Sequence, residues 1–378
     1  MKEIILSDEE NYVTEYRDKS VLLHRVQGDL RKIYIEVTSR CNLDCITCIR
    51  HEWQHDPGDM TLDLFHKIIG DLEKMKRMKE IVFGGFGEPF LHSQIIEMLA
   101  KAKRKNYRVT VTTNGQSLSS EIIDKIIELK VDDLVISVDS FEKIEFENIR
   151  QGGELELLLE NLEELKRKKE KENTIFPRIN MEFVLMRKNK NQLEKLSSYS
   201  RGLGILSILV TNLLPYNEEM TDEILYKKGE NELDMPIQFW ATPIRGLSTL
   251  CTIDLPRMSW GADRQCDFVG NDACAVTAGG DVTPCYSLMH SHRYFIFGRE
   301  KHVSAHSFGN VGDNSLFEIW NSPAYLKFRN RVRNFDFPSC EDCKIKDKCT
   351  YTEQNEDCWG NQPSCADCLW AQGIVRCP

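Results

Sequence analysis

From residue 32 onward, short runs rich in β-branched residues alternate with longer segments in which apolar residues recur every three or four positions. The short runs predict buried strands, and the longer segments predict amphipathic helices. The predicted strands cover residues 33–37, 80–83, 108–112, 133–138, 178–186 and 206–210. The predicted helices cover residues 62–78, 93–105, 120–130, 154–172 and 191–203. This alternation is typical of an α/β fold around a parallel sheet, with fewer strands than the eight that close a full barrel.

The pattern is different on both sides of this region. Residues 1–31 contain short β-prone pieces and predict an N-terminal hairpin extension. Residues 216–263 show no clear period and contain several prolines, which is typical of a linker or a substrate-covering segment. Residues 264–378 are rich in loops and cysteines, so we expect metal clusters to hold this part together. The sequence therefore predicts four parts, with the barrel in residues 32–215.

Composition narrows the class of protein. With 41% hydrophobic residues among 378, the chain can bury a full core, and its net charge of −10 argues against a nucleic-acid partner. The sequence has no apolar run of membrane-spanning length, and its first residues lack the pattern of a secretory signal. We therefore expect a cytoplasmic protein without membrane association. In that compartment the 14 cysteines are expected to be metal ligands or redox groups rather than disulfides.

Three cysteines follow the first predicted strand. Cys41, Cys45 and Cys48 have the spacing C-x3-C-x2-C, so their sulfurs can converge on one metal centre within a short loop. Thiolates are the ligands of iron–sulfur clusters, and a four-iron cluster normally takes four of them. Three thiolates leave one iron open to bind and activate a substrate. A zinc loop and three reduced structural cysteines are the alternatives for this segment.

Glycines and polar residues follow the next three predicted strands. After the second strand, the segment Gly84-Gly-Phe-Gly-Glu-Pro89 leaves backbone groups bare, so a small polar ligand could approach them closely. Asn114 ends the third strand and could face the same site. Ser137 and Asp139 end the fourth strand, and residues two apart on a strand point the same way, which suits ribose hydroxyls. Taken alone, each of these segments is also an ordinary turn.

In this order, the cysteine loop, the glycine segment and the Ser-x-Asp segment resemble the radical S-adenosylmethionine (SAM) superfamily. The resemblance implies a partial (β/α)6 TIM-type barrel with its active site at the carboxyl ends of the strands. It implies that the three cysteines hold a 4Fe–4S cluster and that SAM binds its open iron. It also implies SAM contacts at Gly85, Gly87, Glu88, Pro89, Asn114, Ser137, Asp139 and Arg187. The chain departs from the family at Thr47, where an aromatic or large apolar residue near the adenine is usual.

The later cysteines resemble the SPASM domain, which holds two auxiliary 4Fe–4S clusters in many radical SAM enzymes. The shared pattern is Cys266-x13-Gly280-x4-Cys285, followed by Cys340-x2-Cys343-x5-Cys349. The analogy assigns to the nearer cluster Cys266, Cys274, Cys285 and Cys358, and to the farther cluster Cys340, Cys343, Cys349 and Cys368. Where the family has its next cysteine, this chain has Glu353.

The spacing leaves some of these cysteines open. Cys365 and Cys377 compete with Cys368 for the last ligand position of the farther cluster, and Cys251 is expected to be free. Because C-x2-C pairs also suit zinc, a pair of zinc sites is the alternative for the whole set.

The segment from Asp357 to Pro378 resembles a radical SAM/SPASM subgroup associated with tungsten-containing aldehyde ferredoxin oxidoreductases, called cofactor-modifying or maturase proteins. The resemblance implies an enzyme that cleaves SAM reductively to a 5′-deoxyadenosyl radical and abstracts hydrogen from its substrate. That substrate would be the pterin cofactor or the polypeptide of a tungsten oxidoreductase, and ferredoxin or flavodoxin would donate the low-potential electron. The alternatives are a SPASM-type maturase that cross-links small peptides (RiPPs) and a non-catalytic iron–sulfur electron-transfer protein.

Overall fold

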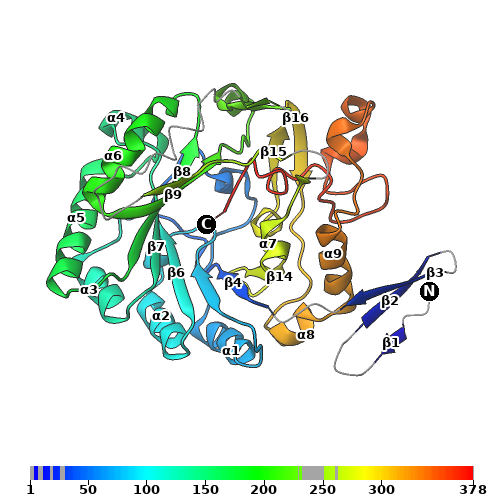
Figure 1. The fold of residues 1–378 in the computed structure, drawn as a ribbon, viewed down its shortest axis with the longest axis horizontal. Coiled ribbons are helices and arrows are strands. Elements are labelled where there is room, and N and C mark those ends of the chain that lie inside the picture. The colour runs from blue at the N-terminus through cyan, green and yellow to red at the C-terminus, as the bar shows by residue number, and fades with distance from the viewer. Residues whose placement is uncertain are drawn as a thin grey trace.

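A curved nine-stranded sheet forms the centre of the molecule (Figure 1). The computed structural model describes residues 4–6, 12–17, 20–25, 30–228, 230–231, 251–259 and 263–377. In spatial order the strands are β12, β9, β8, β7, β6, β5, β4, β13 and β14. The parallel strands at its middle are β4 Lys32–Ile35, β5 Glu80–Phe83, β6 Arg108–Thr113, β7 Asp133–Ser137, β8 Arg178–Leu185 and β9 Ile205–Asn212. Each corresponds to a predicted strand, so the predicted partial α/β barrel is confirmed.

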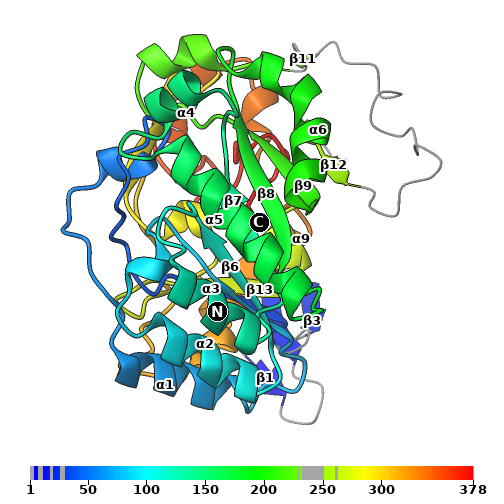
Figure 2. The ribbon, with the colours of Figure 1, turned by 90° about the vertical axis from the view of Figure 1, so that its left-hand side faces the viewer.

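Helices connect these strands and cover the outer face of the sheet (Figures 1 and 2). They are α1 Leu62–Leu72, α2 Ile95–Arg104, α3 Ser120–Glu128, α4 Lys143–Ile149, α5 Leu155–Lys171 and α6 Leu193–Leu203. The prediction extended the first helix to residue 78, but α1 ends at Leu72 and turns follow it. The prediction missed α4 because a helix of 7 residues is too short to establish a helical period.

Segments from outside the predicted barrel extend the sheet at both edges. β12 Thr252–Asp254 lies parallel to β9, and β13 Ala273–Val276 lies parallel to β4. β14 Val282–Thr283 then pairs antiparallel with β13. The sheet is therefore continuous across the boundary that the sequence predicts between the barrel and the cysteine-rich part. The division into domains itself stays a prediction.

The C-terminal part packs beside the barrel and contains little regular structure. Its elements are α7 Asp267–Gly270, β15 His292–Ile296, β16 Arg299–Val303, α8 Leu316–Trp320 and α9 Pro323–Arg333. Several of its cysteines lie on or next to the short 3-10 helices Cys340–Asp342, Lys346–Lys348 and Thr350–Glu353. Of the predicted linker, residues 229, 232–250 and 260–262 lie outside the described residues.

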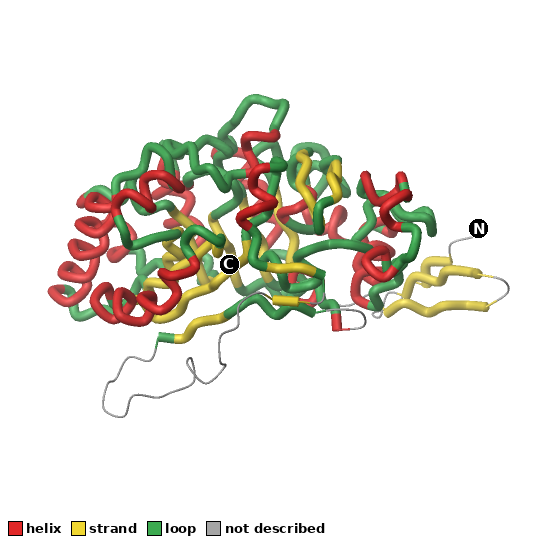
Figure 3. Tube along the Cα trace, turned by 90° about the horizontal axis from the view of Figure 1, so that it is seen from above, coloured by secondary structure: helices red, strands yellow, loops and turns green. Residues whose placement is uncertain are grey.

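The N-terminal strands form a separate sheet. β1 Ile4–Leu6, β2 Tyr12–Arg17 and β3 Ser20–Arg25 pair antiparallel at one end of the molecule, next to the C-terminal part (Figures 1 and 3). The predicted hairpin extension is therefore a three-stranded sheet. Among the helices that the structure describes, none combines the length and the apolar character that a membrane crossing requires.

Segment 365–377 returns from the C-terminal part to the mouth of the barrel. The backbone N–H of Asn212 donates to the carbonyl of Ile374 at 3.2 Å, and the backbone N–H of Arg376 donates to Thr211 Oγ1 at 2.8 Å. The side chain of Ile374 is fully buried. Thr211 and Asn212 end β9, so this segment lies across the carboxyl end of that strand and supplies part of the barrel wall.

Replacing Ile374 with Ala should therefore destabilise the whole fold. Truncating a fully buried isoleucine typically lowers the free energy of unfolding by roughly 2–5 kcal/mol. The matched control is I345A, since Ile345 is 68% exposed and its truncation should change stability by less than about 0.5 kcal/mol. Anaerobic denaturant unfolding measures both variants. Equal effects of the two substitutions would show that segment 365–377 is not packed into the barrel.

Candidate functional site

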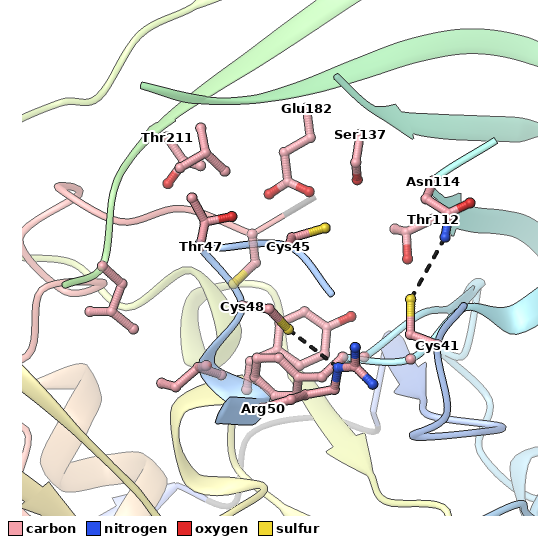
Figure 4. A pocket seen from close by; sticks show the side chains of 18 of the residues that line it. Cys41, Cys45, Thr47, Cys48, Arg50, Thr112, Asn114, Ser137, Glu182 and Thr211 are labelled. Atoms are coloured by element: carbon pink, nitrogen blue, oxygen red, sulfur yellow. Dashed lines mark hydrogen bonds between the residues drawn. The ribbon is translucent and has the colours of Figure 1, made fainter. Parts of the chain in front are cut away.

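One cavity opens at the carboxyl ends of the parallel strands (Figure 4). The cysteine loop and the glycine segment form one side of it, and the ends of β6, β7, β8 and β9 form another. The segment 365–377 closes a third side. The residues that line the cavity include Cys41, Cys45, Cys48, Arg50, Gly85, Phe86, Gly87, Glu88, Thr112, Asn114, Ser137, Arg150, Glu182, Thr211, Tyr286, Trp370, Val375, Arg376 and Cys377.

The structure brings the three predicted cluster cysteines to this cavity. The Asn114 side-chain amide donates to Cys41 Sγ at 3.7 Å, and Arg50 Nε donates to Cys48 Sγ at 3.3 Å. Burial raises the pKa of the Cys45 thiol to about 11, so metal charge beside it would be needed to form the thiolate near neutral pH. Within the described part of the chain, no three histidine, cysteine, aspartate or glutamate side chains converge closely enough to hold a single metal ion.

The glycine segment packs against the residues that lead from β4 into the cysteine loop. A Cβ atom on Gly87 would lie 2.2 Å from the carbonyl oxygen of Thr38, and one on Gly85 would lie 2.8 Å from Glu36 Cβ. Gly85 also has a φ of +121°, which side chains disfavour. Both positions therefore require glycine. The close neighbour is backbone for Gly87 and the Glu36 side chain for Gly85, and both glycines also line the cavity.

Glu88 orders the adjoining strand end. Its buried carboxyl accepts hydrogen bonds from the Asn114 N–H at 2.7 Å, the Thr113 hydroxyl at 2.8 Å and the Phe90 N–H at 3.1 Å. Burial raises the pKa of Glu88 to about 7 despite these donors. Glu88 thus fixes Asn114, which faces Cys41. Pro89 is buried at the start of a 3-10 helix, Pro89–Leu91, and does not reach the cavity, so the expected SAM contact of its side chain is corrected.

Only one member of the predicted ribose pair faces the cavity. Ser137 lines it, whereas Asp139 is 0% exposed and lies behind the wall. The carboxylate of Asp139 accepts from the Val184 N–H at 2.9 Å and pairs with Arg150 Nη2 at 2.9 Å. The expectation that both side chains point the same way is wrong because β7 ends at Ser137 and strand alternation ends with it.

Arg187 also lies away from the cavity. Its exposed guanidinium donates to the carbonyls of Asp222 at 3.0 Å and Ile224 at 3.1 Å. β8 ends at Leu185, so Arg187 follows the chain out of the barrel and holds a surface turn. The expected SAM contact at this position is therefore corrected.

Several cavity residues were not found from the sequence. Arg150 is buried on the cavity wall with its guanidinium paired to Asp139. Glu182 lies on β8, where alternate residues are buried and half-buried, so this carboxyl faces the barrel interior. Burial raises the pKa of Glu182 to about 7. The alternation of polar and apolar residues along β8 was the available signal for Glu182, whereas no local pattern indicates Arg150.

A second cavity gathers later cysteines beneath the first. It is lined by Cys266, Cys285, Cys365, Cys368 and Cys377, and Cys377 lines the first cavity as well. Cys274 is fully buried in β13 beside Ile33 of β4, and it does not reach this cavity. Cys358 is exposed, and it lies close enough to Cys340 to contribute to the raised pKa of that thiol.

This arrangement differs from the predicted ligand sets at three positions. Cys274 and Cys358 are not grouped with Cys266 and Cys285, and Cys368 is grouped with them rather than with Cys340. The physical reason is that cysteines far apart in the sequence are brought together by the fold. The spacing of cysteines along the chain does not show which of them meet. The structure therefore brings Cys266, Cys285, Cys365 and Cys368 to one cavity, together with Cys377. The ligands of the two auxiliary clusters stay a prediction.

Comparison with known proteins agrees with this geometry. The model of the radical SAM superfamily matches residues 35–196, and that of the SPASM iron–sulfur cluster-binding domain matches residues 266–344. The tungsten-containing aldehyde ferredoxin oxidoreductase cofactor-modifying protein of Pyrococcus furiosus is 38% identical over 352 residues, which cover 92% of this chain and 97% of the relative. The mycofactocin maturase MftC of Mycobacterium tuberculosis is 25% identical, with 76% of this chain and 72% of MftC aligned.

Solved structures share the fold at low sequence identity. Streptococcus suis SuiB bound to SAM has a TM-score of 0.61 at 14% identity, covering 86% of this chain and 73% of SuiB. The SAM-bound enzyme anSMEcpe has a TM-score of 0.59 at 16% identity, covering 86% of this chain and 92% of anSMEcpe.

Replacing Asp139 with Asn should strongly destabilise the protein. The change leaves the Arg150 guanidinium buried without its counter-charge, which typically costs roughly 3–5 kcal/mol. D267N is the matched control, because Asp267 pairs with Arg257 at 2.6 Å with half of its side chain exposed. That substitution should cost less than about 1 kcal/mol. Denaturant unfolding compares the two, and a small effect of D139N would contradict the buried pair.

Replacing Glu182 with Gln should stabilise the protein in a pH-dependent way. In the folded protein the pKa of Glu182 is about 7, whereas its ordinary value is 4.5. The stability that comes from keeping this carboxyl protonated is therefore fully present below pH 4.5 and is lost as the pH rises through about 7. We expect E182Q to exceed the wild type by roughly 1–3 kcal/mol in unfolding free energy at pH 8, and by much less at pH 5. The control E170Q, at an exposed glutamate of α5, should change stability by less than about 0.5 kcal/mol at both pH values. A pH-independent effect of E182Q would contradict the burial of this charge.

Proposed function

The chain belongs to the radical SAM superfamily, and we propose that it uses this cavity to bind SAM against a 4Fe–4S cluster and to mature a tungsten-containing oxidoreductase. Membership makes it a radical SAM enzyme whose cofactors are SAM and 4Fe–4S clusters. When bound, these cofactors supply hydrogen-atom abstraction by a 5′-deoxyadenosyl radical. The chain's own residues bind and orient the reactants and exclude water.

The observation that carries the proposal is the meeting of Cys41, Cys45 and Cys48 on one cavity wall, next to the glycine segment. Three thiols suit a four-iron cluster that keeps one iron for SAM. Arg50 and Arg150 place positive charge near these sulfurs, which favours their thiolate form. The donor set therefore fits the cofactor that the family implies.

We assign the polar groups of SAM to the residues around this loop. The backbone of Gly85 and Gly87 would bind the amino group, as the sequence predicts. Arg150 would bind the carboxylate, because its guanidinium lies on the cavity wall and its Nε has no hydrogen-bond partner among the described residues. Ser137 would contact the ribose. Glu88 would act on SAM through Asn114, since its own oxygens accept three hydrogen bonds within the protein.

The C-terminal part contributes a barrier to water. Trp370 and Val375 place apolar surface on the cavity wall. Excluding water strengthens the electrostatic contacts inside a site and protects reactive species from side reactions. The two cysteine sets below this wall would hold the auxiliary clusters.

The tungsten role comes from the Pyrococcus furiosus relative, which aligns over nearly its whole length and is named for modifying a cofactor. We propose that this chain acts on the pterin cofactor or the polypeptide of such an oxidoreductase, with ferredoxin or flavodoxin as electron donor. The cross-linking of small peptides stays an alternative prediction.

An electron-transfer protein is a second candidate because Cys377 lines the same cavity as the three loop cysteines. If Cys377 were the fourth ligand, the first cluster would have no iron left for SAM. The variant C377A separates the two functions. SAM cleavage by the wild type supports the enzyme, whereas cleavage that arises only in C377A supports the electron carrier.

Replacing Cys41, Cys45 and Cys48 together with Ala should abolish formation of 5′-deoxyadenosine from SAM and dithionite. The anaerobically reconstituted wild type should hold about twelve irons and the variant about eight, because only one of three four-iron clusters is removed. C251A is the matched control, since Cys251 precedes β12 and lines neither cavity. It should retain both the iron and the product. Formation of 5′-deoxyadenosine by the triple variant would refute the assignment.

A further inference from the structure

Glu182 is a carboxyl group inside the cavity that no residue of the described structure satisfies. It lies on β8 beside Ser137 of β7 and Leu209 of β9. Among the described residues, no hydrogen bond or ion pair reaches its oxygens. Figure 4 shows its side chain directed from β8 into the space that the cysteine loop borders on the other side.

The charges around Glu182 do not compensate for its burial. Arg150 acts on it only at a distance, because that guanidinium is paired with Asp139. Arg376 also lines the cavity, but its guanidinium is paired with Asp254 at 2.6 Å. Glu182 is half-buried, and a carboxyl withdrawn from water without donors is costly to a folded protein. The cost disappears when a bound ligand donates hydrogen bonds to the carboxylate. A carboxyl with a shifted pKa in a cavity is therefore a candidate for ligand binding.

Other residues that line the same cavity favour a flat ring as that ligand. Phe86, Tyr286 and Trp370 line the cavity and offer aromatic surfaces. Thr211 supplies a neutral hydroxyl group to the same cavity. A carboxylate binds best to two parallel N–H donors, which its two oxygens accept together. A 2-aminopyrimidin-4-one ring presents this edge through its ring N–H and its 2-amino group.

We propose that Glu182 recognises the substrate by accepting both N–H donors of a 2-aminopyrimidin-4-one ring, as found in a pterin. The inference rests on the proposed function and selects the pterin cofactor over the polypeptide as its substrate. Glu182 thereby determines specificity, while the residues around the cysteine loop bind SAM.

The test compares pterin with lumazine, which carries an oxo group in place of the 2-amino group. Equilibrium dialysis of the reconstituted, SAM-loaded protein measures the affinity for each probe. The wild type should bind pterin at least tenfold more tightly than lumazine. The 2-oxo group of lumazine is a hydrogen-bond acceptor and would face the carboxylate of Glu182, which is an acceptor too. E182Q should lose at least tenfold in affinity for pterin and should bind the two probes about equally. Its affinity for SAM should stay within about twofold of the wild type.

T112V is the matched control. Thr112 lines the same cavity, and valine has nearly the same shape without the hydroxyl. This variant should keep the preference for pterin over lumazine, which shows that the preference comes from the carboxylate rather than from any change in the cavity.

Two results would overturn the inference. One is equal or absent binding of pterin and lumazine by the wild type. The other is an E182Q variant that loses SAM affinity tenfold and keeps its pterin preference, which would assign Glu182 to the ribose of SAM. Neither result touches the proposed function, because iron content and 5′-deoxyadenosine formation are measured separately. Failure of the wild type to cleave SAM would instead remove the proposed function, and the dialysis would still report on Glu182.

Discussion

The backbone of the glycine segment packs directly on the backbone of Thr38 and Arg40, which leads into the cysteine loop, and the rest of the cavity depends on this contact. There is no room for a side chain at Gly87, and the Glu88 N–H donates to the Arg40 carbonyl at 2.8 Å. The carboxyl of Glu88 then fixes Asn114 at the end of the next strand. Three strand ends are therefore held in one arrangement by backbone hydrogen bonds and one buried carboxyl. Such rigid support is what a site needs in order to position reactants.

Much of this arrangement could be predicted from the sequence, for physical reasons that are local. Strands β4 to β9 were found because each is a short apolar run followed by a periodic helix. The cavity residues Cys41, Gly85, Asn114 and Ser137 were found because parallel strands bring their carboxyl ends to one edge. Asp139 was misplaced because alternation predicts direction only while the strand lasts, and β7 ends two residues earlier.

The remaining residues of the site could not be predicted because distant segments place them. Arg150 reaches the wall through its pairing with Asp139, and Trp370 reaches it because segment 365–377 crosses the end of β9. The grouping of Cys365 and Cys368 with Cys266 likewise depends on a fold-wide return of the chain. Cys274 lies in the short strand β13 with its thiol buried in the hydrophobic core, away from the cavity of the other cysteines. Spacing along the chain carries no information about such returns.

Segment 365–377 connects the two cavities, because its residues line both of them. Its first cysteines border the lower cavity, and its last residues form the wall of the upper one. Few residues separate these ends, and their backbone is hydrogen-bonded to Arg257, Asn212 and Thr211. Oxidation of Cys365 or Cys368 would therefore displace the wall that faces the substrate, even with Cys41, Cys45 and Cys48 intact. Oxygen damage at the second cavity would therefore change the shape of the first cavity, where the substrate is expected to bind.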